Sequence, residues 1–192
     1  MGTTQPIRDK QELNAFMEYY HTSQPSARNY ALIVFGLHTA LRISDILNLK
    51  WENVYDFDMN CFLEHLFLTE KKTGKKNVVA LNAHVKEALI VYMKERNPVP
   101  SDYIFTKNTD YTVPLCRSQA FRIVKKAANE SLHLTHISCH SLRKTFGYHA
   151  WKQGTPPALL MDIYNHSSYQ VTKKYLGIEQ DERDSIFLTL QL

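Results

Sequence analysis

The sequence predicts a mainly α-helical domain that carries one small antiparallel β-sheet, an α+β class. Apolar residues recur at helical spacing over most of the 192 residues. One pair of β-rich segments, 61–70 and 77–82, flanks the turn sequence KKTGKK, in which Gly74 allows the chain to reverse. With 44% hydrophobic and 22% charged residues, the chain has the composition of a globular domain with its own core.

The first third of the chain is expected to form helices on either side of a break. Residues 11–20 show an apolar stripe of helical period. Ser26 can cap a long helix over NYALIVFGLHTA, which is apolar almost all round and is therefore predicted to be buried. Ser44 can cap the next helix, DILNLKW, so Arg42 falls between two helices.

The chain after the hairpin is expected to be helical, with helices at 83–96, 119–130, 140–153, 158–165 and 169–176. Ser118 can open the second of these, with Phe121, Val124 and Ala128 facing inward. Gly177 directly follows the last one and is typical of a helix end.

Composition narrows the class of partner. A formal net charge of +4 and a pI of about 8.9 favour a polyanion, although weakly. Three cysteines without CxxC spacing indicate free thiols in a reducing compartment. The sequence has neither an apolar run of membrane-spanning length nor the pattern of a secretory signal. We therefore expect a cytoplasmic protein with no membrane partner.

Cationic side chains stand in two apolar contexts. In CHSLRKTFGYHAW, His140 and Arg143 are three residues apart, which places them on one face of a helix. Arg42 lies in HTALRISDILNL. Desolvating an arginine is costly unless an anion meets it, and Asp45 could supply that charge in a purely structural ion pair.

Further reactive groups follow in the hairpin and near the C-terminus. Lys71 and Lys72 lie at the hairpin tip, where they could also simply blunt a strand edge. YNHSSYQVTKKYLG places His166 before a helix and Tyr175 at its end, where the tyrosine could equally be half-buried core. Arginines, histidines, a lysine and a tyrosine without an acidic cluster suit a phosphoryl centre, so we expect no metal or other cofactor.

In this order, the motifs HTALRISDIL, KKTGKK, HSLR, NHSS and KKYLGI resemble those of the tyrosine recombinases, the phage integrase family. The resemblance runs from about residue 30 to 178, and the ordered set is far more specific than any one motif. It implies the catalytic-domain fold of that family. It also implies a site-specific recombinase or integrase that cleaves and rejoins DNA through a 3′-phosphotyrosine, in integration or excision of a mobile element.

The resemblance implies how the scissile phosphate would be held. Arg42 and Arg143 would clamp it, and His166 would donate a further hydrogen bond. Asp45 resembles the acidic residue that accompanies and holds the first arginine. Ala40 departs from the family pattern, because it replaces a glycine common before the first Leu-Arg, and this puts the local loop geometry in question.

The resemblance also implies the groups that move protons and form the covalent bond. Tyr175 would be the nucleophile, and His140 would accept its proton. Lys72 would protonate the 5′-oxygen, because the family's lysine directly precedes Thr-Gly, but Lys71 remains a competitor. Asn165 replaces the glycine usual before the second histidine, a second departure beside the reacting groups.

Candidate DNA contacts lie on two helices. Arginine and glutamine can read base edges, while lysine mostly meets phosphates. A solvated helix face is an equally good explanation of the first group. The candidates are Arg117, Gln119, Arg122, Lys125 and Lys126 around the helix after Ser118, and Lys173 and Lys174 beside the proposed nucleophile.

The domain organisation follows from the same resemblance. Residues 1–180 would be the catalytic domain, and the N-terminal core-binding domain usual in the family is expected to be absent, so the chain is either a fragment or a minimal form. The tail 181–192 would pack on a neighbouring protomer, or fold back or be disordered in isolation, or form a self-docked helix. Expected partners are double-stranded DNA, further copies in a tetramer on DNA, and an accessory DNA-bending protein at the nucleoid.

The residues allow three other interpretations. A type IB topoisomerase uses similar chemistry, but nothing in the sequence resembles its large clamp domains. A catalytically silent DNA-binding regulator is disfavoured because every reactive residue type is retained. A metal site would draw on His133, His136, Cys139 and His140, which lack a standard ligand spacing.

Overall fold

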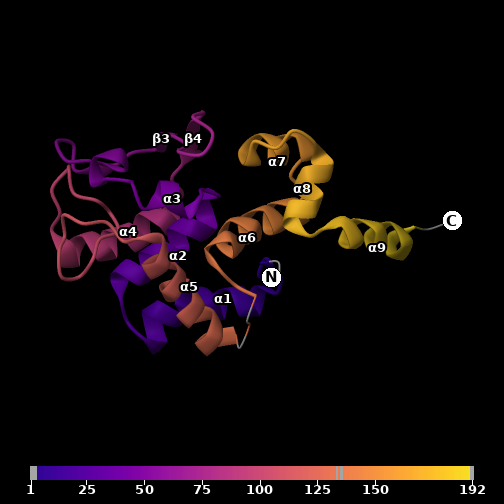
Figure 1. The fold of residues 1–192 in the computed structure, drawn as a ribbon, viewed down its shortest axis with the longest axis horizontal. Helices are drawn as coiled ribbons and strands as arrows, with labels where there is room; N and C mark the ends of the chain where they lie inside the picture. Colours follow the sequence, from indigo (N-terminus) through magenta and orange to yellow (C-terminus); the bar gives the residue numbers. More distant parts are fainter. Residues whose placement is uncertain (1–3, 133, 135, 191–192) are drawn as a thin grey trace.

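Helices account for most of the backbone, and the β-strands lie at one edge of the helical body (Figure 1). The computed structural model describes residues 4–132, 134 and 136–190. The predicted class, mainly α with a small antiparallel β-structure, is confirmed. No helix within the described ranges is long and apolar enough to cross a membrane.

Two N-terminal helices form the base of the fold, α1 over Lys10–Glu18 and α2 over Ala27–Thr39. As expected, Ser26 caps α2 by accepting a hydrogen bond from the amide of Asn29. Residues 31–37 of α2 are all buried, because the helix is apolar on every side and other helices cover each of them. α2 is thus the central element against which the rest of the domain packs.

The next helix, α3, is a single turn over Ile43–Ile46. The expectation that Ser44 caps a longer helix is wrong, because the amides of Asp45 and Ile46 already bond to the carbonyl of Arg42. Arg42 therefore occupies the N-cap position itself, in extended conformation. The helix ends early because the chain turns to bury Trp51, which is completely covered in the core.

The β-structure consists of two separate antiparallel pairs, β1 (Tyr55–Asp56) with β2 (Cys61–Phe62), and β3 (His65–Thr69) with β4 (Lys76–Ala80). The expected hairpin is confirmed as β3–β4, and Gly74 in its turn has a φ of +68°, which favours glycine. The expected first strand, 61–70, is in fact divided between β2 and β3. The β3–β4 turn reaches back towards the helices that carry the candidate site residues (Figure 1).

Two longer helices pack beside α2 and α3: α4 over Ala83–Arg96, as expected, and α5 over Arg117–Leu132. α5 begins one residue before its expected cap at Ser118. Val124 and Ala128 face inward as expected, but the expectation for Phe121 is wrong, because its side chain is 45% exposed. The buried stripe runs through Ala120, Val124, Ala127 and Ala128, and Phe121 lies at its edge near the start of α5.

Four helices follow α5 within the described residues: α6 over Cys139–Lys152, α7 over Pro157–Tyr164, α8 over Tyr169–Leu176 and α9 over Glu179–Thr189. Ser138 caps α6, and Gly177 closes α8 in the left-handed conformation, as expected. α9 extends away from the body rather than folding back or docking on it (Figure 1).

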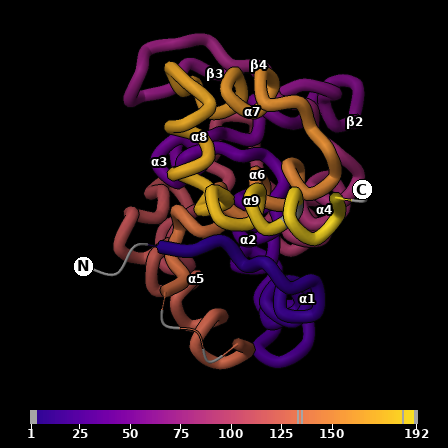
Figure 2. Tube along the Cα trace, turned by 90° about the vertical axis from the view of Figure 1, so that its right-hand side faces the viewer, coloured from indigo at the N-terminus to yellow at the C-terminus, as the bar shows by residue number. Residues whose placement is uncertain are grey.

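The N-terminal segment crosses α6 and reaches the joint between α8 and α9 (Figure 2). The amide of Ile7 donates to Thr145 Oγ1 at 2.9 Å. The guanidinium of Arg8 donates to the carbonyl of Gly177 at 2.7 Å and pairs with Asp181 at 3.0 Å. Residues from the two ends of the described chain therefore hold the last two helices together.

Candidate active site

Arg143 lies on the buried face of α6, with only 3% of its surface exposed. Its guanidinium donates to the carbonyl oxygens of Ala40 and Tyr164, the latter at 3.4 Å, and lies 4.6 Å from the centroid of the Tyr164 ring. These contacts fix the arginine between α2, α6 and α7. Of the pair expected on one face of this helix, Arg143 is buried and His140 is exposed.

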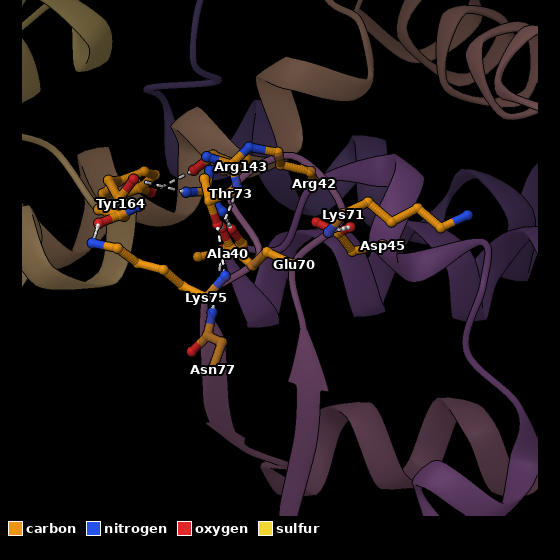
Figure 3. Close-up of polar contacts among 11 residues, drawn as sticks. Ala40, Arg42, Asp45, Glu70, Lys71, Thr73, Lys75, Asn77, Arg143 and Tyr164 are labelled. Atoms are coloured by element: carbon orange, nitrogen blue, oxygen red, sulfur yellow. Dashed lines mark hydrogen bonds and ion pairs between the residues drawn. The ribbon is translucent and has the colours of Figure 1, made fainter.

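Arg42 projects from the start of α3 towards the same region, and its side chain is 19% exposed (Figure 3). It forms an ion pair with Glu70, with 2.5 Å between Nη1 and Oε2. The suggestion that Asp45 neutralises it is wrong. Asp45 Oδ1 instead accepts a hydrogen bond from the backbone amide of Lys71, at 3.1 Å, and so holds the start of the hairpin turn.

Glu70 is a buried carboxylate that the sequence analysis did not single out. Burial acts to raise its pKa, but hydrogen bonds from Thr73 and Arg42 and the charges of Arg42 and Arg143 outweigh that effect and hold the pKa below its ordinary value. Glu70 is therefore ionised at neutral pH. A sequence signal existed, since an acidic residue stands directly before KKTGKK, but an acidic residue next to lysines normally indicates a solvent-exposed side chain.

The hairpin turn presents its lysines in different directions. The ammonium of Lys71 donates to Asn48 Oδ1 at 2.7 Å, on the side away from Arg143 (Figure 3). Lys75 donates to the side-chain oxygen of Asn165, beside His166. Lys72 is exposed and makes no hydrogen bond or ion pair within the described part of the chain. This arrangement favours Lys72 over Lys71 as the lysine free to reach a bound substrate.

His166 precedes α8 and Tyr175 lies in its last turn, and their two side chains are in contact. Their rings are 5.2 Å apart between centroids, and His166 Nδ1 is 3.0 Å from Thr172 Oγ1. Burial lowers the pKa of His166, and the charges of Arg143 and Arg42 lower it further. The ring is therefore neutral near pH 7, and its Nε2 remains available to a substrate.

Tyr175 is half-buried, as the core alternative expected, and it lies beside Arg143. Burial raises the pKa of its phenol, while the charge of Arg143 and a hydrogen bond with it, and the charge of Arg42, act in the opposite direction. The ammonium of Lys144 lies 5.2 Å from the centroid of the tyrosine ring. The phenol thus faces three cations.

His140 stands on the exposed first turn of α6. Partial burial lowers its pKa, as do the positive charges of Arg117, Arg143, Lys144 and Arg42, named in order of effect. A neutral imidazole at pH 7 can accept a proton. The charges of Arg42 and Arg143 therefore act together on His140, His166 and Tyr175, so these five residues lie in one neighbourhood.

The two family glycines replaced in this chain both occupy left-handed backbone. Ala40 has a φ of +54° and Asn165 has a φ of +53°. Asparagine tolerates this region better than other non-glycine residues, and alanine does so at a cost of about 1 kcal/mol. Both replacements therefore stand in a backbone conformation that favours glycine.

The candidate DNA contacts fall into two groups. Arg117, Arg122 and Lys174 are exposed and free to meet a substrate. Gln119 accepts a hydrogen bond from the amide of Cys116 at 2.9 Å, and so caps its own helix, while Lys173 pairs with Glu182 at 3.2 Å. Lys125 and Lys126 complete the set; Lys125 is half-buried, and Lys126 is exposed and lies 3.9 Å from Glu130.

No group of three metal-ligating side chains occurs in the part of the chain that the structure describes. Of the four residues weighed for a metal site, His136, Cys139 and His140 are described, and His133 lies outside the described residues. The cation-rich site above offers donors for an anion and few ligands for a metal.

The comparisons with known proteins agree with this geometry. The model of the "Phage integrase family" matches residues 8–182. The probable integrase/recombinase YoeC of Bacillus subtilis is 37% identical over 181 residues, which cover 94% of this chain and 93% of the relative. The tyrosine recombinase XerC of Bacillus licheniformis is 26% identical, and the match covers 90% of this chain and 57% of the relative.

A solved structure has the same fold. The XerH site-specific recombinase, bound to a palindromic difH substrate in a post-cleavage complex, superposes with a TM-score of 0.76 at 20% identity, over 98% of this chain and 54% of that one. The family model and the relatives together define a tyrosine-type site-specific recombinase. The chain belongs to the phage integrase family.

Proposed function

We propose that this chain cleaves and rejoins double-stranded DNA through a 3′-phosphotyrosine at Tyr175. The observation that carries the proposal is the phenol of Tyr175 lying beside Arg143, with His166 at 5.2 Å and the charge of Arg42 acting on the same groups. A tyrosine buried only for packing would not need an arginine hydrogen-bonded to its hydroxyl and the charge of a second arginine acting on it. YoeC and XerC, whose names place them among recombinases, support the same activity.

The residues divide the reaction among themselves. Arg42, Arg143 and His166 hold the non-bridging oxygens, and each preorganised donor of this kind contributes about 3–4 kcal/mol to a developing oxyanion. The oxygen of Tyr175 attacks phosphorus, and its proton passes to neutral His140.

The bond from phosphorus to the 5′-oxygen breaks in the same step, and the ammonium of Lys72 protonates the departing oxygen. Attack by a 5′-hydroxyl on the phosphotyrosine reverses the sequence and rejoins the strand. Asp45 supports the site from behind by holding the amide of Lys71.

The test is covalent capture on a nicked suicide substrate of the chain's own recombination site, with EDTA present. The wild type should form a protein–DNA adduct that survives SDS, and Tyr175→Phe should form none. Tyr169→Phe is the matched control, because it removes a hydroxyl from the same helix that bonds to Glu182 instead of facing Arg143. Adduct formation by Tyr175→Phe, or none by the wild type on its own site, would refute the proposal.

DNA would bind across the exposed cations Arg117, Arg122 and Lys174, with an affinity that falls steeply with salt. A DNA substrate would place the enzyme in the cytoplasm at the nucleoid. Its use in integration or excision of a mobile element, and the help of an accessory DNA-bending protein, belong to the same proposal.

Residues 1–180 are proposed as the catalytic unit and 181–192 as a protomer-exchange segment within a tetramer on DNA. The described part of that segment supports this, because Ile186, Phe187 and Leu188 are 64%, 81% and 84% exposed. Apolar side chains in such a row are typical of a surface that a partner covers. A groove of about 440 Å³ between α1, α2 and α6, lined by Leu13, Met17 and other residues, is a candidate acceptor.

A further inference from the structure

Glu70 joins two parts of the site that are far apart in the sequence. It follows the last residue of β3, and only 3% of its surface is exposed. Its Oε2 accepts hydrogen bonds from Arg42 Nη1 at 2.5 Å and from Thr73 Oγ1 at 2.8 Å (Figure 3). One carboxylate oxygen therefore ties the first arginine directly to the hairpin turn.

The backbone of the turn is closed on the same residue. The amide of Glu70 donates to the carbonyl of Lys75 at 2.9 Å, and the amide of Gly74 donates to the carbonyl of Glu70 at 2.8 Å. On the other side, Asp45 Oδ1 holds the amide of Lys71 at 3.1 Å. Two acids thus determine where the whole turn lies relative to α3.

The side chain of Lys72 has no such support of its own. It is exposed and unpaired within the described residues, so its ammonium can be placed only through the backbone of the turn. We propose that Glu70 is a positioning residue for proton delivery, holding the turn so that Lys72 reaches the 5′-oxygen. This inference rests on the function proposed above.

The bond to Arg42 is less critical once DNA is bound. The scissile phosphate then offers the guanidinium an anion in the site itself, and a planar fork can serve two anions at once. Thr73 has no comparable substitute for the carboxylate of Glu70. Loss of the Glu70 carboxylate should therefore impair protonation of the leaving group more than it impairs binding of the scissile phosphate.

This difference can be measured with the leaving group itself. In the normal step the tyrosyl oxygen bonds to phosphorus, the bond to the 5′-oxygen breaks, and that oxygen takes a proton from Lys72. When sulfur replaces the 5′-bridging oxygen, a thiolate departs and needs no proton, because thiols are far more acidic than alcohols. A 5′-phosphorothiolate substrate thus bypasses the lysine but still needs the arginines and Tyr175.

The experiment compares single-turnover cleavage of matched oxygen and sulfur suicide substrates. Glu70→Ala removes the carboxylate that accepts hydrogen bonds from both Arg42 and Thr73. Thr73→Val removes only the hydrogen bond from the turn and leaves Arg42 paired with Glu70. Both should slow cleavage of the oxygen substrate by about 10- to 100-fold, a part of what general acid catalysis supplies, and should cleave the sulfur substrate within about twofold of wild type. Thr112→Val is the matched control, since Thr112 makes the same kind of turn bond, to Asp110 at 2.7 Å, away from the site, and should change neither rate.

Each result decides between explanations. An equal loss on both substrates in Thr73→Val would overturn the inference, because the tie would then serve the fold or the phosphate rather than the lysine. Unchanged or faster cleavage of the oxygen substrate in both variants would overturn it as well. If the wild type forms no adduct on either substrate, the proposed function fails and this inference fails with it.

Discussion

Helices α8 and α9 follow one another in the chain, yet one packs into the domain and the other does not. α8 buries Thr172 and Leu176 completely against a small cluster that includes Tyr148, Tyr164 and Ile178. None of the described side chains of α9 is buried. Gly177, in left-handed conformation, separates the two helices.

Their apolar patterns explain the difference. Thr172 and Leu176 are four residues apart, so they share one face of α8 that can lie against α6. In α9 the apolar residues come consecutively, at 186–188, after two turns of charged residues. Consecutive residues point in different directions round a helix, so no single surface of the same domain can cover them.

Ion pairs hold the beginning of α9. Asp181 pairs with Arg8 at 3.0 Å and Glu182 pairs with Lys173 at 3.2 Å. These pairs are partly exposed, and such pairs contribute about 0–1 kcal/mol each. The comparison teaches that the position of α8, which carries Tyr175, is determined within one chain, whereas the end of α9 is suited to a surface outside it.

The largest effect is expected where α8 meets α6. A Cβ on Gly147 would lie 2.6 Å from Leu176 Cδ2 and still closer to Tyr164 Oη, and neither buried side chain has room to move. Gly147→Ala should lower the free energy of unfolding by about 1–3 kcal/mol, seen as a lower Tm. It should also reduce adduct formation below that Tm, because Tyr175 moves with α8.

The matched control is Gly36→Ala, which would crowd the same helix, α6, from its other side, 2.6 Å from Leu142 Cδ1. It should lower the Tm but leave adduct formation by the folded protein nearly unchanged. Equal losses of activity in both variants at matched fractions folded would show that α8 is not positioned through Gly147.

A smaller effect is expected at the turn that leads into α8. Asn165 holds a φ of +53° there, and its side-chain oxygen accepts a hydrogen bond from Lys75. Asn165→Ala should cost about 1 kcal/mol, because the left-handed region is unfavourable for alanine. Asn165→Gly should be close to neutral in stability, since it removes strain along with the contact. Urea unfolding of the pair measures the difference, and equal destabilisation would mean that the contact, not the backbone, matters.

Much of the packed part of the domain, from α2 to α8, could be predicted from the sequence. The caps at Ser26 and Gly177 and the range of α4 follow from local chemistry, and the ordered motifs identified Arg42, Arg143, His166 and Tyr175 as neighbours. Such signals are short in range or fixed in order, so one sequence suffices to read them. The roles of these residues remain predictions until the adduct is tested.

The errors and omissions depend on the third dimension. The helical spacing of Phe121 with Val124 and Ala128 predicts that it faces inward, but which residues of this stripe are covered depends on the neighbouring elements, and Phe121 stays 45% exposed. From the sequence, Glu70 is an acidic residue next to lysines, which predicts exposure to solvent. Only the return of the hairpin to α3 buries it against Arg42. The extended position of α9 also has no local sequence signal, because it depends on whether the rest of the domain has a surface that can cover the apolar residues of α9.

The smallest effect on stability is expected at the end of α9. Phe187 and Leu188 are 81% and 84% exposed, so replacing both with serine removes almost no buried area and should leave the Tm of the free protein within about 1 °C. If a second copy covers them on DNA, the double variant should bind its site as single protomers, and native mass spectrometry of the complex would show the loss of larger assemblies.

Met59→Ser is the matched control, since Met59 is 73% exposed on the β1–β2 turn. A double variant that still assembles as the wild type does would refute the exchange role, and a large fall in Tm would mean that α9 docks on its own domain after all.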